Sequence, residues 1–184
     1  MIVQKVLNNS LVLSMDDDNR EVIVMGKGIG FNSRPGDAIA PEKIEKLFVT
    51  QALGARSGYL EALSAIPDEV IEMAAMIISR ANMQLASKVR EQIFFTLADH
   101  LTFAIERSRK GIAIQNRLLP EVRRFYPQQF RVASEAVTII RQQYGIELPE
   151  EEAGNIAFHL VNGQSEGDDV AQTMQSVKML KDIF

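Results

Sequence analysis

Residues 22–31 hold the side chains best suited to binding another molecule. The run Val-Ile-Val-Met is typical of a buried strand, and Gly-Lys-Gly-Ile-Gly-Phe follows it. Alternating glycines let the backbone adopt a positive φ or let another molecule approach it closely. Lys27 and Phe31 would then face that molecule. A cation and a flat ring beside bare backbone suit unpaired nucleobases, because the ring stacks on a base while the ammonium group meets phosphate.

Two other interpretations of this stretch lead to different chemistry. The spacing alone favours an ordinary glycine-rich turn. A dinucleotide-binding loop fits poorly, because Phe31 occupies the place of the third glycine in G-x-G-x-x-G and residues 32–36 predict a turn instead of a helix.

The two histidines, His100 and His159, are the other candidates for chemistry. Helical periodicity places each at the border between the apolar and polar faces of its helix. The simplest interpretation is two half-buried histidines with neighbouring partners. Zinc is poorly supported, since the chain has no cysteine and no H-E-x-x-H spacing. Acid–base catalysis would need an orienting carboxylate, and Asp99 is unsuited because adjacent residues on a helix do not face one another.

The elements that must position these residues change type near residue 56. Before it, the sequence predicts an antiparallel meander with strands at 2–7, 11–15 and 21–25. A fourth strand is expected at 44–49, although the segment from Pro41 could also begin a helix. Both faces of this sheet carry apolar side chains. About fifty residues cannot cover two faces, so we expect a second copy to pack there as a dimer.

From residue 63 the hydrophobic period lengthens to that of a helix. The predicted helices cover 67–78, 90–109, 118–126, 130–144 and 149–163. Residues 57–62 lack a clear period and are expected to be a linker. The predicted fold class is therefore α+β, with a small, dimerising antiparallel sheet domain followed by an all-α five-helix bundle.

Composition excludes several classes of protein. The absence of cysteine excludes disulfide scaffolds and thiol nucleophiles, and no apolar run approaches the ~20 residues that span a bilayer. We predict a cytoplasmic protein without metal, cofactor or enzymatic activity. The net charge of −4 comes from residues 57–184, since residues 1–56 hold seven basic and seven acidic residues. A neutral domain with a local basic face of Lys5, Lys27 and Arg34 would bind folded RNA by shape and base contacts.

Segments in both parts of the chain resemble a known family. KVLNN at 5–9, VMGKGIGF at 24–31 and IEK at 44–46 resemble the co-antiterminator RNA-binding domain of BglG/LicT/SacY-type transcriptional antiterminators. The second part resembles that family's first PTS regulation domain, through TLADH at 96–100, LL and YP within 118–127, and GNIAFHLV at 154–161. The resemblance implies an RNA-binding domain at 1–56, a linker at 57–62, a regulation domain at 63–170, and the start of an inter-domain linker helix at 171–184.

The resemblance also implies roles for individual residues. The RNA surface would comprise Lys5, Asn8, Asn9, Ser10, Gly26, Lys27, Gly28, Phe31 and Asn32. His100 and His159 match the two histidines that the phosphotransferase system phosphorylates. Ser10 and Lys27 stand where the family often has asparagine and arginine, and both changes shorten the hydrogen-bonding reach toward RNA.

Family members are dimers that bind a hairpin in the leader RNA of a sugar-utilisation operon. That hairpin excludes a terminator hairpin, so binding favours read-through. The sugar-specific permease generally inhibits through the first regulation domain. The general phosphocarrier normally activates through a second regulation domain, which this chain is expected to lack. The alternative function is a phosphorelay or protein-interaction module whose β-domain serves only for dimerisation.

Overall fold

The computed structural model describes residues 1–50 and 58–164. It divides the chain into two compact units, Met1–Glu72 and Met73–Phe184. The inter-domain helix predicted at 171–184 lies outside the described residues. Each unit is considered by itself below.

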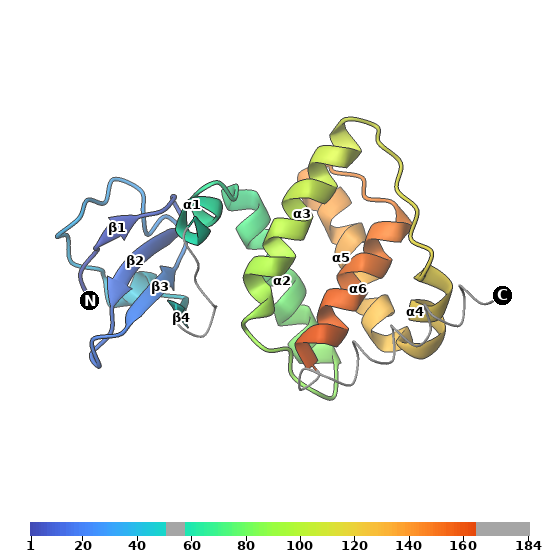
Figure 1. The fold of residues 1–184 in the computed structure, drawn as a ribbon, viewed down its shortest axis with the longest axis horizontal. Helices are drawn as coiled ribbons and strands as arrows, with labels where there is room; N and C mark the ends of the chain where they lie inside the picture. The colour runs from blue at the N-terminus through green and yellow to red at the C-terminus, as the bar shows by residue number, and fades with distance from the viewer. Residues whose placement is uncertain (51–57, 165–184) are drawn as a thin grey trace. The chain divides into compact units, whose positions relative to one another are not determined.

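The first unit is built on a four-stranded antiparallel sheet with the order β1-β2-β3-β4 (Figure 1). Its strands are β1 (Lys5–Val6), β2 (Leu11–Met15), β3 (Glu21–Met25) and β4 (Lys46–Val49). The predicted meander is confirmed. A short 3₁₀ helix, η1 (Pro41–Lys43), precedes β4. The segment from Pro41, for which the sequence allowed either a helix or a strand, therefore contains both.

The first strand is shorter than the predicted 2–7, because its two ends pair with different segments. β1 pairs with β2, whereas Ile2 forms an isolated bridge with Ala38. Val3 exchanges backbone hydrogen bonds with residues 36 and 37, at 2.8 and 2.9 Å. The bend between these two pairings ends the regular ladder at Lys5.

Both faces of the sheet are buried within one chain. One face joins a core formed by Val3, Val12, Val22, Val24, Ile29 and Ile39. On the other face, Leu11 and Ile23 are also fully buried. One chain therefore buries both faces of the sheet without a second copy, and the dimer stays a prediction.

Helix α1 (Tyr59–Ser64) occupies most of the predicted linker at 57–62. Part of the segment that is expected to be a linker is thus helical. The helix follows Gly58, which has a φ of 89°. Six residues make fewer than two turns, so no amphipathic period could develop in the sequence.

The five predicted helices are confirmed, with shifts at their ends. They are α2 (Asp68–Gln84), α3 (Ile93–Arg109), α4 (Leu119–Phe125), α5 (Pro127–Tyr144) and α6 (Glu150–Gln164). α5 begins three residues earlier than predicted, because proline suits the first turn of a helix. In the second unit α6 packs against α3, α4 and α5 (Figure 1).

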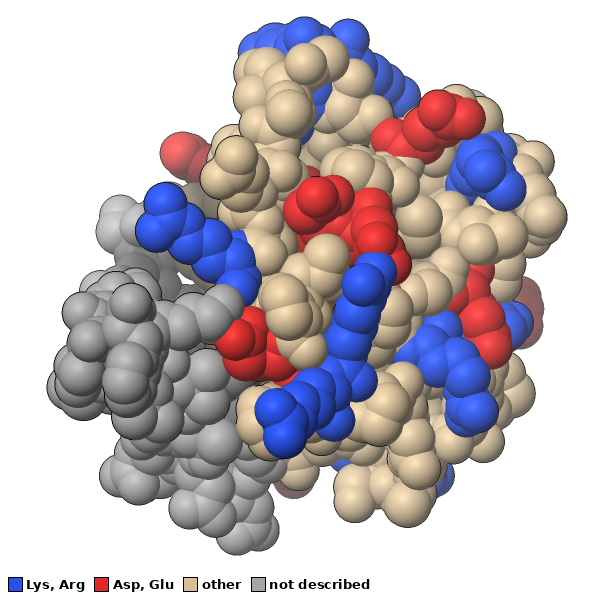
Figure 2. Space-filling model, turned by 90° about the vertical axis from the view of Figure 1, so that its right-hand side faces the viewer, with Lys and Arg blue, Asp and Glu red and all other residues tan. Residues whose placement is uncertain are grey.

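The surface of the helical unit does not present one sign of charge. Figure 2 shows basic and acidic side chains interspersed across the face that lies to the right in Figure 1. A surface of this kind gives little non-specific attraction to nucleic acid. None of the helices in the described residues has the length and apolar character needed to cross a membrane.

Candidate functional site

The glycine-rich stretch forms a tight loop directly after β3. Gly28 has a φ of 66°, in the left-handed region. A Cβ atom on Gly26 would lie 1.8 Å from the carbonyl oxygen of Lys43, and one on Gly30 would lie 2.0 Å from that of Asn8. The protein's own backbone therefore requires two of the three glycines. The sequence offered a positive φ or the approach of another molecule as the reason for these glycines, whereas at positions 26 and 30 the constraint comes from the protein's own backbone.

The loop at 8–10 lies beside this glycine-rich loop. The backbone N–H of Gly30 donates to the carbonyl oxygen of Asn9 at 2.9 Å, and that of Gly26 donates to Ser10 at 3.0 Å. Two segments that are far apart in the sequence thus form one continuous surface.

Five predicted RNA-binding residues of this unit are exposed. They are Lys5, Asn9, Lys27, Phe31 and Asn32. The Phe31 side chain is the most notable, because 63% of this large apolar residue is exposed. An exposed aromatic ring on the same loop as an exposed lysine is an arrangement suited to stacking on a base.

Asn8 is half-buried, and its side chain is fully used within the protein. Its Oδ1 accepts from the backbone N–H groups of Ser10 and Leu11, both at 2.9 Å. Its Nδ2 donates to the carbonyl oxygens of Leu63 at 3.1 Å and Ile66 at 3.3 Å. Asn8 therefore ties the loop at 8–10 to the end of α1.

Asp68, the first residue of α2, binds the two residues that follow Asn8. Its Oδ2 accepts from Asn9 Nδ2 at 3.1 Å, and its Oδ1 accepts from Ser10 Oγ at 2.9 Å. The sequence indicated only that Asp68 favours the start of a helix. We call the contacts of Asp68 with Asn9 and Ser10 the Asp68 clamp. Three predicted RNA-binding side chains are thus engaged by residues 63–68.

In the second unit, the structure brings the two histidines together. His100 lies on α3 and His159 on α6, and their ring centroids are 5.1 Å apart. Both side chains are half-buried, so the prediction that each lies at the border of core and water is confirmed. Their sequence positions alone gave no sign of this approach.

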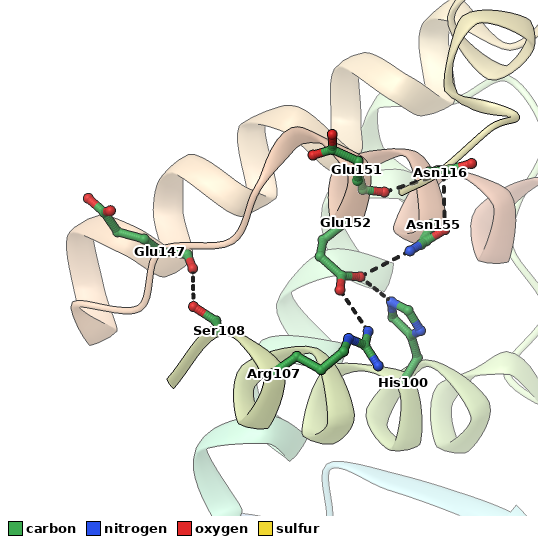
Figure 3. Close-up of polar contacts among 8 residues, drawn as sticks. All are labelled: His100, Arg107, Ser108, Asn116, Glu147, Glu151, Glu152 and Asn155. Carbon is green, nitrogen blue, oxygen red and sulfur yellow. Dashed lines mark hydrogen bonds and ion pairs between the residues drawn. The ribbon is translucent and has the colours of Figure 1, made fainter. Parts of the chain in front are cut away.

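A buried carboxylate connects the histidine pair to its surroundings (Figure 3). Glu152 Oε2 lies 2.8 Å from His100 Nε2 and accepts from Asn155 Nδ2 at 3.1 Å. Its Oε1 accepts from Arg107 Nη2 at 2.7 Å. The Glu152 side chain is only 2% exposed, so these three groups replace the water that it would otherwise bind.

The surroundings shift two pKa values in this cluster. Burial raises the pKa of Glu152, but hydrogen bonds from His100, Arg107 and Asn155 outweigh it and bring the pKa down to about 2. Burial, together with the nearby His100, lowers the pKa of His159 to about 4. At neutral pH the cluster therefore contains an ionised Glu152 and a neutral His159.

Asn116 supports this cluster from the segment before α4. Its Nδ2 donates to Asn155 Oδ1 at 3.0 Å and to the carbonyl oxygen of Glu151 at 3.3 Å. A Cβ atom on Gly154 would lie 2.8 Å from the same Nδ2. The small residue at 154 therefore lets Asn116 approach α6 and hold Asn155 in place.

The sequence analysis missed Glu152, Arg107 and Asn155, although a signal was present. Glu152, Asn155 and His159 are spaced i, i+3 and i+7, and this spacing places them on one face of α6. His100 and Arg107 are likewise seven residues apart on α3. From the sequence alone, Glu152 is only one of three acids that favour the N-terminus of this helix. Within the described residues, no three His, Asp or Glu side chains are placed to hold a metal ion.

Comparison with known families matches both units. Residues 1–54 match the CAT RNA binding domain, and residues 75–163 match the PRD domain.

Two curated relatives align over all 184 residues. The chain is 39% identical to a beta-glucoside operon antiterminator of Dickeya chrysanthemi and 34% identical to the transcription antiterminator LicT of Bacillus subtilis (strain 168). It spans 65% and 66% of the length of these two proteins. The crystal structure of GlcT CAT-PRDI is also similar, with a TM-score of 0.76 at 28% identity, covering 90% of this chain and 98% of that one.

Proposed function

The chain belongs to the BglG/LicT family of transcription antiterminators, and from this membership we propose that its first unit binds a hairpin in the leader RNA of a sugar-utilisation operon. Binding stabilises the hairpin and so prevents formation of a terminator. We propose β-glucosides as the sugar class, in line with the Dickeya chrysanthemi relative. The site of action is the cytoplasm, where leader RNA is transcribed.

The observation that carries this proposal is the continuous surface of the loops at 8–10 and 26–31. It combines the exposed ring of Phe31 with the exposed ammonium group of Lys27. The ring would stack on an unpaired base of the hairpin, and the ammonium group would meet a phosphate. The backbone of Gly28, where the space for a side chain is open, would lie between them without a side chain to block a base edge.

Asn8, Asn9 and Ser10 take part in this proposal only after a change of partners. Asp68 now holds Asn9 and Ser10, and the end of α1 holds Asn8. RNA would replace Asp68 as the acceptor for the Asn9 amide and the Ser10 hydroxyl. Asn8 would keep its turn-forming contacts with the backbone of residues 10 and 11 and act as a support.

We propose that the second unit reports sugar supply through phosphorylation of His100 or His159. The sugar-specific permease and the general phosphocarrier of the phosphotransferase system would be the donors. The half-buried position of both rings supports this, because a phosphate would bring up to about two negative charges to a packed helix border beside Glu152.

A homodimer is also part of the proposal, on grounds other than the sheet face. Phe103 is 53% exposed and lies three residues after His100, on the same side of α3. A dimer contact at this ring would lie one helical turn from His100, so a phosphate on His100 would act directly on it. Sedimentation of the chain with and without phosphate on histidine measures whether the two are coupled.

Binding to the leader hairpin and to a scrambled stem-loop, across a salt series, tests the function. We expect selective binding with a modest salt slope, and a loss on the order of 1–3 kcal/mol for Phe31→Ala, as for other base-stacking rings. Lys27→Ala should reduce the salt slope by about one. Phe125→Ala and Lys88→Ala are matched controls, since both residues are exposed and lie in the second unit. Equal binding of both RNAs would favour the phosphorelay module instead.

A further inference from the structure

The hydrogen bond with Glu152 determines which nitrogen of the His100 ring carries a proton. Glu152 is ionised at neutral pH, and a carboxylate can only accept hydrogen bonds. The 2.8 Å contact with Glu152 Oε2 therefore requires a proton on His100 Nε2. When the ring is neutral, its lone pair is left on Nδ1, and only a nitrogen with a free lone pair can attack phosphorus.

The two ring nitrogens also differ in their surroundings. Nε2 faces a carboxylate whose side chain is 2% exposed, whereas Nδ1 points away from it (Figure 3). A phosphoryl group at Nε2 would have to displace Glu152 and would place about two negative charges against it. Arg107 and Asn155 hold Glu152 from its other sides, so the carboxylate cannot turn away without losing both hydrogen bonds.

We propose that His100 accepts the phosphoryl group on Nδ1, and that Glu152 is the positioning residue that selects this nitrogen. This inference rests on the proposed function, in which a phosphorylated protein is the donor. It specifies which ring nitrogen of His100 is modified and which residue selects that nitrogen. The His100 side chain is 19% exposed, so the ring is partly accessible from outside the packed cluster.

The transfer is balanced without any further reactant. The Nδ1 lone pair forms a new N–P bond while the bond between phosphorus and the donor's phosphorylated side chain breaks. That donor side chain takes back the electron pair of the broken bond. The ring becomes an imidazolium that keeps its proton on Nε2, where the Glu152 carboxylate stabilises the positive charge.

The first test identifies which ring nitrogen carries the phosphate after the phosphotransferase proteins have phosphorylated the unaltered chain. Trypsin cuts after Arg90, Arg107, Arg141 and Lys178, so His100 and His159 fall in different peptides. Antibodies that distinguish the two phosphohistidine isomers then report the nitrogen for each peptide. Phosphate on Nδ1 of His100 is the expected result. Phosphate on Nε2 of His100, or on His159 alone, overturns the inference but leaves the proposed function standing. No phosphohistidine at all overturns the proposed phosphorylation of the second unit, while the proposed RNA binding of the first unit keeps its own test.

Glu152→Gln tests the role of the carboxylate. A glutamine can donate to Nε2 as well as accept from it, so the tautomer is no longer fixed. We expect the ratio of Nδ1 to Nε2 phosphate to fall by about tenfold, the order by which a charged acceptor exceeds a neutral one. Glu151→Gln is the matched control, because it removes the same charge from the neighbouring position. An unchanged ratio in Glu152→Gln refutes the positioning role, and the ratio is independent of how much folded protein each variant yields.

Discussion

The Asp68 clamp gives a quantitative prediction about RNA affinity. Asp68 accepts one hydrogen bond from the exposed Asn9 and one from the buried Ser10. Hydrogen bonds to a charged acceptor contribute about 1.5–3 kcal/mol when protected from water, and much less when exposed. Because the exposed bond contributes little, we expect the clamp to stabilise the arrangement in which Asp68 binds Asn9 and Ser10 by about 1–2 kcal/mol. If RNA must take over Asn9 and Ser10, the clamp weakens apparent affinity by about 5- to 30-fold.

Asp68→Ala should therefore bind the leader hairpin about 5- to 30-fold more tightly than the parent chain. Removing a negative charge also favours RNA binding in general. Asp17→Asn controls for this, because it removes an exposed charge from the same unit and changes no RNA-facing contact. Titration of labelled hairpin at two salt concentrations compares the two variants. If Asp68→Ala gains no more than Asp17→Asn does, the clamp does not oppose RNA binding and the reasoning is refuted.

Two further predictions concern stability. Gly30→Ala should lower the free energy of unfolding by about 2–3 kcal/mol, because the new Cβ atom would overlap the carbonyl oxygen of Asn8. Urea unfolding measures this change, and an unchanged free energy of unfolding would contradict the predicted overlap. The pKa of His159 falls from 6.5 to about 4, so the folded state disfavours the proton and stability is lost as pH drops from 6.5 through about 4. His159→Gln should flatten the pH dependence of the melting temperature in that window, and an unchanged slope would contradict the assignment.

The elements of the fold could largely be predicted from the sequence, because their signals are local. Short apolar runs bounded by polar turns identified β2 and β3, and helical periods with glycine or proline at the ends identified α2 to α6. Local signals were insufficient for two of the elements. β1 is short because Ile2 pairs with Ala38, and α1 is too short to show a period.

The sites were less predictable, because they depend on tertiary contacts. Asp68 lies 58 residues beyond Ser10, and no local pattern links these two positions. The approach of His100 to His159 likewise depends on how α3 packs against α6. Glu152 could have been found from the polar spacing on α6, which places a carboxylate on the same face as His159.

If the first unit binds a leader hairpin as proposed, the glycine-rich loop has a consequence for how quickly it does so. Its shape is held by backbone hydrogen bonds from Ile29 to Gly26, Phe31 to Gly28 and Gly30 to Asn9. Little main-chain order remains to be gained when a partner arrives, and side-chain exchanges at Asn9 and Ser10 take only nanoseconds to microseconds. A nascent transcript offers its hairpin only until polymerase has copied the terminator. A main chain already folded before the encounter is suited to that race, since only the side chains of the Asp68 clamp must still change partners.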